Sequence, residues 1–204
     1  MFIIISGPSG SGKTPIVYSL MEAFPNIKKV QSYTTRPIRA KEVTGTYIYV
    51  SKAEFEEKIK QGFFLEYNKV HKDQQYYGTG MDSFIGASTN GFVALKDIDV
   101  DSYKDLKENH KDLDIVGIYV TVKDRDVLFK RLRERGESEH TIEIRLHDRV
   151  DYENSQQNFY DYVVYTDDIN DAIEKVVDIV NKEFKKRKIK VKANKLKRNK
   201  KHMF

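Results

Sequence analysis

The chain contains no cysteine, so neither disulfides nor cysteine-ligated metals can stabilise it, and this composition fits a reducing compartment. Its five histidines are scattered and show no spacing typical of metal ligands. The apolar run at residues 2–5 is too short, and lacks the basic flank, for a signal peptide or a membrane span, and no other stretch approaches spanning length. We therefore expect a cytoplasmic protein without membrane contact.

Acidic residues are almost missing from the end of the chain. Residues 182–204 contain twelve Lys and Arg and a single Glu, so they carry a formal charge of +11, whereas the whole chain carries +5. The first 181 residues are therefore mildly acidic, at −6. Because apolar residues are sparse from Lys185 onward, we expect residues 185–204 to form a solvated, disordered tail or a frayed extension of the last helix. The other interpretation is a weak, salt-sensitive contact with nucleic acid or an acidic surface.

The most informative stretch is residues 7–14, which have the pattern G-x-x-x-x-G-K-[ST] directly behind the apolar run. The run predicts a strand buried on both faces, and the pattern that follows it is typical of a P-loop. Glycines let the backbone N–H groups turn towards a phosphate, and the following helix presents its positive N-terminus to the same anion. We expect the loop to bind the phosphates of a nucleotide, with Lys13 bridging the β- and γ-phosphates and Thr14 holding Mg²⁺. The residues expected to contact the cofactor are Gly7, Ser9, Gly10, Ser11, Gly12, Lys13 and Thr14.

Apolar strands alternate with helical patterns along the rest of the chain. Strands without polar alternation favour a parallel sheet that helices cover on both faces, so the predicted fold class is α/β. The carboxyl ends of parallel strands share one edge of the sheet, where ligands gather. A chain of 204 residues suffices for one core with small inserted lobes, but not for two full-sized domains. The pattern predicts strands at 2–5, 29–33, 47–50, 63–67, 92–95, 115–122 and 161–165, helices at 16–24, 124–135, 138–154 and 169–184, a further helix capped by Ser51, and an aromatic turn at 75–80.

Several motifs together resemble those of guanylate kinases in order and spacing. The most specific is Ser32-Tyr33-Thr34-Thr35-Arg36-Pro37-Ile38-Arg39, which follows the P-loop. The resemblance covers about residues 1–184 and implies a P-loop NTPase three-layer fold with a parallel central sheet, an inserted GMP-binding lobe at about 32–83 and a helical lid at about 131–150. It also implies Mg²⁺-dependent transfer of the γ-phosphate of ATP to GMP, giving ADP and GDP. The other matching motifs lie at 42–47, 64–66, 76–79, 97–99 and 131–136.

The resemblance assigns one group of residues to GMP. Arg36 and Arg39 would hold its phosphate with two tyrosines, because planar guanidinium groups match phosphate oxygens and hydroxyls add neutral donors. Glu66 would select guanine, since a carboxylate accepts hydrogen bonds from both the N1–H and the 2-amino group, whereas adenine has no N1–H. The implied GMP-binding set is Ser32, Arg36, Arg39, Tyr47, Glu66, Tyr77, Thr79 and Asp99.

A second group would act on the transferred phosphate. Asp97 and Asp99 resemble the D-x-D of guanylate kinases, which reaches toward Mg²⁺ and the GMP side of the site. Arg131, Arg135 and Arg145 fall on lid arginines that close over the phosphates of ATP. Phosphoryl transfer needs positioning and charge neutralisation rather than a general base, because the attacking GMP phosphate oxygen is already a nucleophile. The implied catalytic set is Lys13, Arg36, Asp97, Arg131, Arg135 and Arg145.

Four residues depart from the pattern of the resembling family. Pro15 follows the P-loop, where a first-turn proline is tolerable because a helix start does not need its missing N–H. Thr166 replaces an asparagine in the loop that would approach adenine. Lys96 occupies a strand position that is usually apolar, and Ser102 replaces a glycine. From sequence, the last two indicate a divergent surface near the site.

Other functions stay open at this point. Glu66 argues for a guanine base, but dGMP or another monophosphate remains a candidate substrate. A second alternative is a catalytically weak guanylate-kinase-like module that binds a nucleotide or a partner, although the charged residues of the site are all present. In a third, the basic tail makes nucleic-acid binding the main function. The sequence does not determine the oligomeric state.

Overall fold

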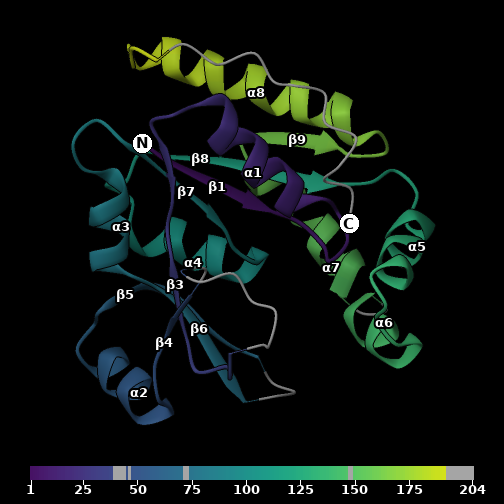
Figure 1. Cartoon of the computed structure of the whole chain (residues 1–204), viewed down its shortest axis with the longest axis horizontal. Helices are drawn as coiled ribbons and strands as arrows, with labels where there is room; N and C mark the ends of the chain where they lie inside the picture. Colours follow the sequence, from purple (N-terminus) through teal and green to yellow (C-terminus); the bar gives the residue numbers. More distant parts are fainter. Residues whose placement is uncertain (39–44, 46, 71–73, 147–148, 192–204) are drawn as a thin grey trace.

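The structure is a computed structural model that describes residues 1–38, 45, 47–70, 74–146 and 149–191. Its core is a five-stranded sheet of strand order β2-β7-β1-β8-β9 (Figure 1), and every neighbouring pair is parallel. All five residues of β1 and all seven of β8 are buried, as runs of large apolar residues favour. The expected parallel sheet is therefore confirmed. The strands are β1 (Phe2–Ser6), β2 (Ile27–Lys29), β7 (Val93–Asp97), β8 (Ile115–Thr121) and β9 (Tyr162–Tyr165).

Helices cover both faces of this sheet and complete three layers. Helices α1 (Lys13–Ala23) and α8 (Ile169–Lys186) lie side by side on one face, as Figure 1 shows, and share an apolar cluster with alternate residues of the strands. On the other face, α3 (Met81–Ser88) and α4 (Val100–Asn109) pack against the remaining strand residues. This arrangement confirms the predicted α/β three-layer fold, and it adds α3 and α4 to the predicted helices.

A second, four-stranded sheet of order β4-β3-β6-β5 projects from the core. The strands are β3 (Ser32–Thr34), β4 (Tyr47–Tyr49), β5 (Phe64–Val70) and β6 (Gln75–Gly80). Helix α2 (Lys52–Lys60) packs on this lobe, and Ser51 with Glu54 forms the predicted capping box at its start.

Two predictions in the lobe were wrong. The expected aromatic turn at 75–80 is strand β6, because its backbone pairs with β5 on one side and β3 on the other. The expected strand at 29–33 is two strands, since β2 ends at Lys29 in the core sheet and β3 starts at Ser32 in the lobe sheet. The chain thus crosses from one sheet to the other between these residues.

The segment after β8 forms a helical arm with its own small apolar cluster, centred on Leu128, Leu132 and Ile142. It consists of α5 (Asp126–Glu134), α6 (Glu139–Leu146) and α7 (Arg149–Ser155), followed by a short 3₁₀ helix, η1 (Gln157–Phe159). The helix expected at 138–154 is therefore described as two helices, on either side of residues 147–148. In Figure 1 the arm and the lobe extend from the same side of the core sheet.

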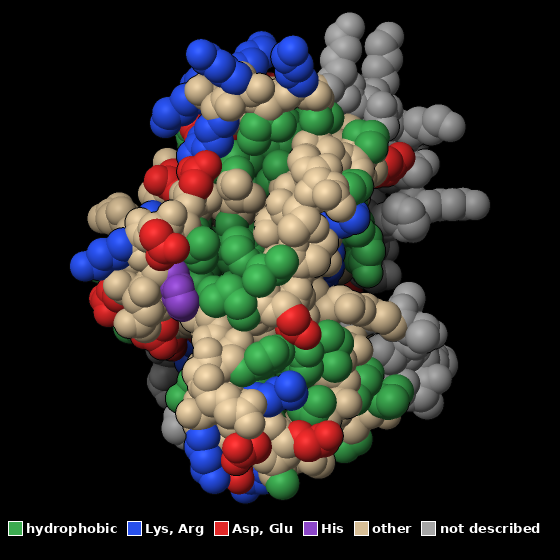
Figure 2. All heavy atoms as spheres, turned by 90° about the vertical axis from the view of Figure 1, so that its left-hand side faces the viewer, with side chains coloured by type: hydrophobic (Ala, Val, Ile, Leu, Met, Phe, Trp, Pro, Cys, Tyr) green, Lys and Arg blue, Asp and Glu red, His purple; other side chains and the backbone are tan. Residues whose placement is uncertain are grey.

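The basic C-terminal segment begins as a continuation of α8 and packs against the core through Ile189 and Val191, so the expected disorder is wrong for residues 185–191. Lys185 and Lys186 belong to α8, and the next residue, Arg187, pairs with Asp114 at 2.6 Å and with Glu183. The rest of the segment, residues 192–204, lies outside the described residues. On the face of the molecule in Figure 2, apolar side chains gather below a basic upper edge, and α3 on that side exposes 37% of Met81 and 51% of Ile85. Among the helices described, none is long and apolar enough to cross a bilayer.

Candidate active site

The P-loop connects β1 to α1 at the carboxyl edge of the core sheet. Gly7, Gly10 and Gly12 all have positive φ angles, of 145°, 82° and 91°. A Cβ atom on Gly7 would lie 1.9 Å from the carbonyl oxygen of Val120 on the neighbouring strand, so only glycine fits there. The Lys13 Nζ donates hydrogen bonds to the carbonyl oxygens of Gly7 (2.6 Å) and Pro8 (2.8 Å), which places the ammonium group inside the curl of the loop.

Charged groups from three other parts of the chain surround Lys13. Burial lowers the pKa of its ammonium group, and the carboxylates of Glu153 on α7 and Asp97 at the end of β7 oppose this effect. The guanidinium group of Arg135, after α5, lowers the same pKa. The core sheet and the helical arm therefore bring charged groups to the P-loop lysine, including two that the sequence predicts as site residues.

Arg131 on α5 is fixed directly to the P-loop. Its guanidinium group donates to the carbonyl oxygen of Gly10 at 3.2 Å and to the hydroxyl oxygen of Thr166 at 3.1 Å. Thr166 is fully buried, and its hydroxyl donates to the carbonyl oxygen of Ser11 at 2.7 Å. Thr166, which stands where the resembling family commonly has an asparagine, thus links Arg131 to the backbone of the P-loop. The side chain of Arg145, the third expected lid arginine, lies outside what the structure describes.

Aromatic and basic side chains gather on the lobe. The guanidinium of Arg36 lies 5.2 Å from the ring centroid of Tyr47, and that ring lies 6.1 Å from the ring of Tyr77. Burial raises the pKa of the Tyr47 hydroxyl, and the carboxylate of Asp97 raises it further. Arg39, the second expected phosphate-binding arginine, lies outside the described residues.

A buried carboxylate lies deeper in the lobe. Glu66 on β5 is only 8% exposed, and the hydroxyl of Thr79 on β6 donates to its Oε1 at 2.5 Å. Burial raises the pKa of Glu66, while the ammonium of Lys96 and the hydroxyls of Thr79 and Ser102 oppose this. A buried carboxylate with neighbours of this kind is an acceptor for hydrogen-bond donors of a ligand.

Lys96 and Ser102 lie beneath the lobe, 2% and 3% exposed, so the expectation of a divergent surface was wrong. Lys96 is buried because it lies on β7, where successive side chains alternate between the two faces of the sheet, and it shares a face with buried Ala94. Its Nζ donates to the carbonyl oxygen of Val30 at 3.1 Å and to the hydroxyl oxygen of Ser32. Both departures therefore contact predicted site residues, Lys96 through Ser32 and Ser102 through Asp99.

The two aspartates of the D-x-D motif differ in their surroundings. Asp97 ends β7 and pairs with Lys29 at 3.1 Å. Asp99 is the N-cap of α4, where it accepts hydrogen bonds from the backbone N–H groups of residues 101 and 102. The side-chain amide of Asn68 and the guanidinium of Arg149 also contact Asp99, at 3.1 and 3.7 Å. Asp99 thereby joins the lobe, the core and the helical arm.

Comparisons with known proteins agree with this geometry. A sequence model of the family described as guanylate kinase matches residues 1–183. The chain belongs to the guanylate kinase family. It is therefore an ATP:GMP phosphotransferase, a nucleoside monophosphate kinase.

Individual relatives match most of the chain. The guanylate kinase of Helicobacter hepaticus is 37% identical over 181 residues, which are 87% of this chain and 88% of that protein. The guanylate kinase of Rickettsia bellii is 35% identical over 189 residues, which are 92% of this chain and 96% of that protein. The crystal structure of guanylate kinase from Anaplasma phagocytophilum has the same fold, with a TM-score of 0.68 at 24% identity, and covers 90% of this chain and 85% of that one.

In this guanylate kinase, two site residues escaped the sequence prediction. Arg149 was predicted to be a solvated helix residue, but it pairs with Asp101 at 3.0 Å and with Glu153 at 2.9 Å. Glu153 is 7% exposed and acts on the pKa of Lys13. The one signal available was the spacing of Arg149 and Glu153, four residues apart on a predicted helix, which is the spacing of an ion pair.

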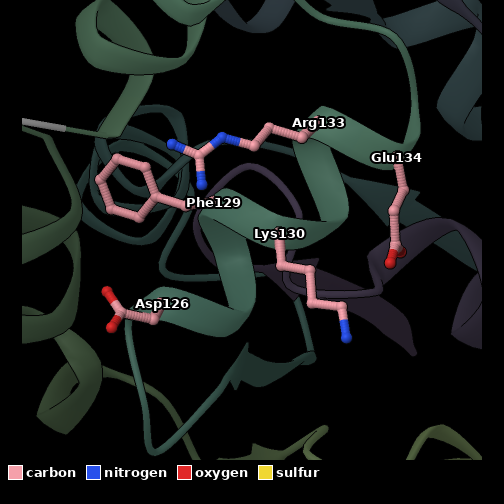
Figure 3. Close-up of a pocket in the computed structure, with 5 residues that line it drawn as sticks. All are labelled: Asp126, Phe129, Lys130, Arg133 and Glu134. Atoms are coloured by element: carbon pink, nitrogen blue, oxygen red, sulfur yellow. The ribbon is translucent and has the colours of Figure 1, made fainter.

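A surface hollow of about 570 Å³ lies apart from these residues (Figure 3). It is lined by one helix, α5, with two acidic side chains, two basic side chains and one aromatic ring, so its formal charges cancel. One of them, Arg133, is already paired with Glu139 at 2.6 Å. None of the predicted site residues lines it, and we assign it no part in the kinase reaction. The lining residues are Asp126, Phe129, Lys130, Arg133 and Glu134.

The buried charge of Lys96 predicts an unusual pH dependence of stability. Burial lowers its pKa from 10.5 to about 8, although Glu66 and Asp97 attract it. Below pH 8 both the folded and the unfolded protein carry the proton, so burial of the charge destabilises the fold by its full amount. Between pH 8 and 10.5 only the unfolded state keeps the proton, and stability rises with pH.

Replacing Lys96 by methionine removes this pH dependence but also leaves the buried carboxylate of Glu66 without its cation, which lowers stability at every pH. We therefore expect the free energy of unfolding of Lys96→Met, relative to the wild type, to be up to ~3 kcal/mol more favourable at pH 7 than at pH 10, since one pKa unit corresponds to about 1.4 kcal/mol. Urea denaturation of both proteins at pH 7 and pH 10 measures this difference, and tyrosine titration cancels because both proteins contain the same tyrosines. A difference in stability between the two proteins that is the same at pH 7 and pH 10 would contradict the prediction.

Proposed function

We propose that the residues at the carboxyl edge of the core sheet divide the kinase reaction between two ends of one site. The P-loop with Lys13 binds the phosphates of ATP, and the lobe binds GMP. The observation that supports this division is the position of Asp97, whose carboxylate affects the pKa of both Lys13 and Tyr47. The ATP end and the GMP end therefore meet at the end of β7.

On the GMP side, Glu66 accepts hydrogen bonds from the N1–H and 2-amino groups of guanine, and Ser32 and Thr79 complete the contacts to the base. Arg36 and Arg39 bind the phosphate of GMP together with Tyr47 and Tyr77, and Asp99 contributes on the same side. The position of the Arg36 guanidinium, 5.2 Å from the centroid of the Tyr47 ring, supports this arrangement, because a cation attracted by an aromatic ring is held in place before the phosphate arrives.

In the reaction, an oxygen of the GMP phosphate forms a bond to the γ-phosphorus of ATP while the bond from that phosphorus to the β–γ bridging oxygen breaks. GDP and ADP result, and no proton needs to be removed from the nucleophile. Lys13, Arg131 and Arg135 neutralise the charge that develops on the transferred group, and Arg145 adds to them as the arm closes. Closure of the helical arm over the phosphates would exclude water and prevent simple hydrolysis of ATP.

Mg²⁺ is part of the proposal as the metal that accompanies ATP. Thr14 lies exposed in the first turn of α1, next to the P-loop lysine, and its hydroxyl is the hard oxygen donor that Mg²⁺ prefers. Asp97 is the nearest candidate carboxylate on the core sheet. When bound, the metal would neutralise phosphate charge. We propose that the nucleotide supplies further ligands; among the described residues, no group of three or more His, Cys, Asp or Glu is placed to hold a metal.

The experiment is an assay of ADP formation from ATP and Mg²⁺ with GMP, dGMP, AMP and UMP in turn. We expect turnover with GMP, weaker or equal turnover with dGMP, and rates at least about tenfold lower with AMP and UMP, because neither adenine nor uracil presents two adjacent donors to a carboxylate. Binding of GMP without turnover would instead support the binding-module alternative. Turnover with all four monophosphates would contradict the role of Glu66.

A cytoplasmic location is also part of the proposal.

A further inference from the structure

Lys96 is a buried cation that the kinase reaction does not require. In the described part of the chain, Lys96 contacts neither the carbonyl groups of the P-loop nor Arg36 and the tyrosines beside it. Its Nζ donates to the Val30 carbonyl oxygen at 3.1 Å and to the hydroxyl oxygen of Ser32, and its charge attracts the carboxylate of Glu66. Both Ser32 and Glu66 belong to the proposed guanine-binding set. The cation therefore lies directly behind the residues that would contact the base.

The chemistry of the ammonium group determines what Ser32 can do. An ammonium group has three donors and no acceptor, so the Ser32 oxygen must accept from Lys96. The hydroxyl hydrogen of Ser32 then points away from Nζ and is available as a donor, strengthened by the cation behind it. A purine carbonyl oxygen opposite this hydroxyl would be attracted, whereas a purine amino group, with its own positive hydrogens, would be repelled.

We propose that Lys96 is a positioning residue that makes the site selective for a carbonyl oxygen at position 6 of the purine, by holding Ser32 as a hydrogen-bond donor. The inference deepens the proposed function and rests on it, because it needs Ser32 to face the base. Guanine carries O6 at this position and adenine carries an amino group.

The rest of the cluster complements this assignment. Guanine presents one acceptor, O6, beside two donors, N1–H and the 2-amino group. The Lys96–Ser32 pair offers positive charge and a donor, and Glu66 with its partner Thr79 offers negative charge and acceptors. Ser102, which also lies beside Glu66, donates its hydroxyl hydrogen to Asp99 at 3.1 Å. The cluster is thus complementary in charge to the guanine edge, because it is positive where guanine has its acceptor and negative where guanine has its two donors.

The test compares kcat/KM for three substrates in the wild type, Lys96→Met, Ser32→Ala and the double variant. GMP and 6-thioguanosine monophosphate differ only at position 6, and GMP and inosine monophosphate differ only at position 2. We expect Lys96→Met to narrow the preference for GMP over the 6-thio analogue by about fivefold, the value of one ordinary hydrogen bond, and to leave the preference over inosine monophosphate unchanged. Lys28→Met, an exposed lysine on the adjacent strand β2, is the matched control and should change neither ratio.

Ser32→Ala should narrow the position-6 preference by the same factor, and Lys96→Met should add nothing in that background, because one residue acts through the other. An unchanged position-6 preference in Lys96→Met, or additive effects in the double variant, would overturn the inference while leaving the kinase function intact. Equal changes at positions 2 and 6 would also overturn it, since they indicate general damage to the pocket. Wild-type protein that binds none of the three nucleotides by calorimetry would overturn both proposals together.

Discussion

Replacing Lys13 by methionine should lower kcat for GMP phosphorylation by about 10²- to 10³-fold, the usual effect of removing one preorganised donor to the charge that develops in a transition state. The ammonium group lies inside the curl of the P-loop, 2.6 and 2.8 Å from the carbonyl oxygens of Gly7 and Pro8. Burial lowers its pKa, so the folded protein holds this charge at a cost. The fold should therefore tolerate methionine at this position.

The measurement combines steady-state kinetics with thermal denaturation. We expect the loss in turnover while the melting temperature stays the same or rises. Lys130→Met is the matched control, since Lys130 lines the hollow on α5 and should leave both rate and stability unchanged. A Lys13→Met variant with wild-type turnover would show that the P-loop does not bind the transferred phosphate. Equal losses of turnover in the two variants would contradict the prediction and would indicate that the hollow on α5 contributes to the reaction.

Local sequence signals predicted the core of the fold well. The P-loop pattern behind residues 2–5 needs no distant partner to be recognised, because its glycines report backbone angles that other residues avoid, and Gly7, Gly10 and Gly12 have such angles. The capping box at Ser51 and the long amphipathic helix α8 are also local signals, and both are present. Pro15 lies in the first turn of α1, where a proline was expected to be tolerated.

Predictions that depended on distant partners were less accurate. Residues 75–80 contain two glycines, which favour a turn, but pairing with β3 and β5 makes them a strand. The split of the predicted strand at 29–33 also depends on which sheet offers an edge at each residue. Neither choice is encoded in the segment itself.

The same limit applies to the candidate site. Sequence motifs named Glu66, Thr79 and Ser32, and the structure places Thr79 on Glu66 and Lys96 on Ser32. Whether Lys96 faces solvent or the site depends on the direction of its side chain and on the lobe that covers it, so its departure from the family pattern looked like a surface change. Arg149 and Glu153 were missed because α7 is far from the P-loop in the sequence, and only the fold brings the two together.

Glu66→Gln should reduce kcat/KM for GMP by about 10- to 150-fold, since a hydrogen bond to a charged group contributes roughly 1.5–3 kcal/mol and each 1.4 kcal/mol is a factor of ten. Glutamine keeps the shape and one carbonyl acceptor, but it places an amide donor opposite a donor of guanine. The loss should appear mainly in KM, because the base is bound equally in the ground state and the transition state. The preference for GMP over inosine monophosphate should fall, since inosine monophosphate lacks the 2-amino group that Glu66 would bind.

Stability separates this effect from damage to the lobe. Glu66 is 8% exposed and burial raises its pKa, so loss of the carboxylate removes a buried charge but also leaves Lys96 without its attraction. These changes oppose each other, and we expect the melting temperature to shift little. Glu57→Gln, an exposed residue of α2 in the same lobe, is the control and should keep the wild-type KM. If Glu66→Gln kept both the KM for GMP and the preference for GMP over inosine monophosphate, Glu66 would not be the residue that recognises the 2-amino group of guanine. The Lys96–Ser32 pair could not replace it in that role, because that pair is proposed to act at position 6.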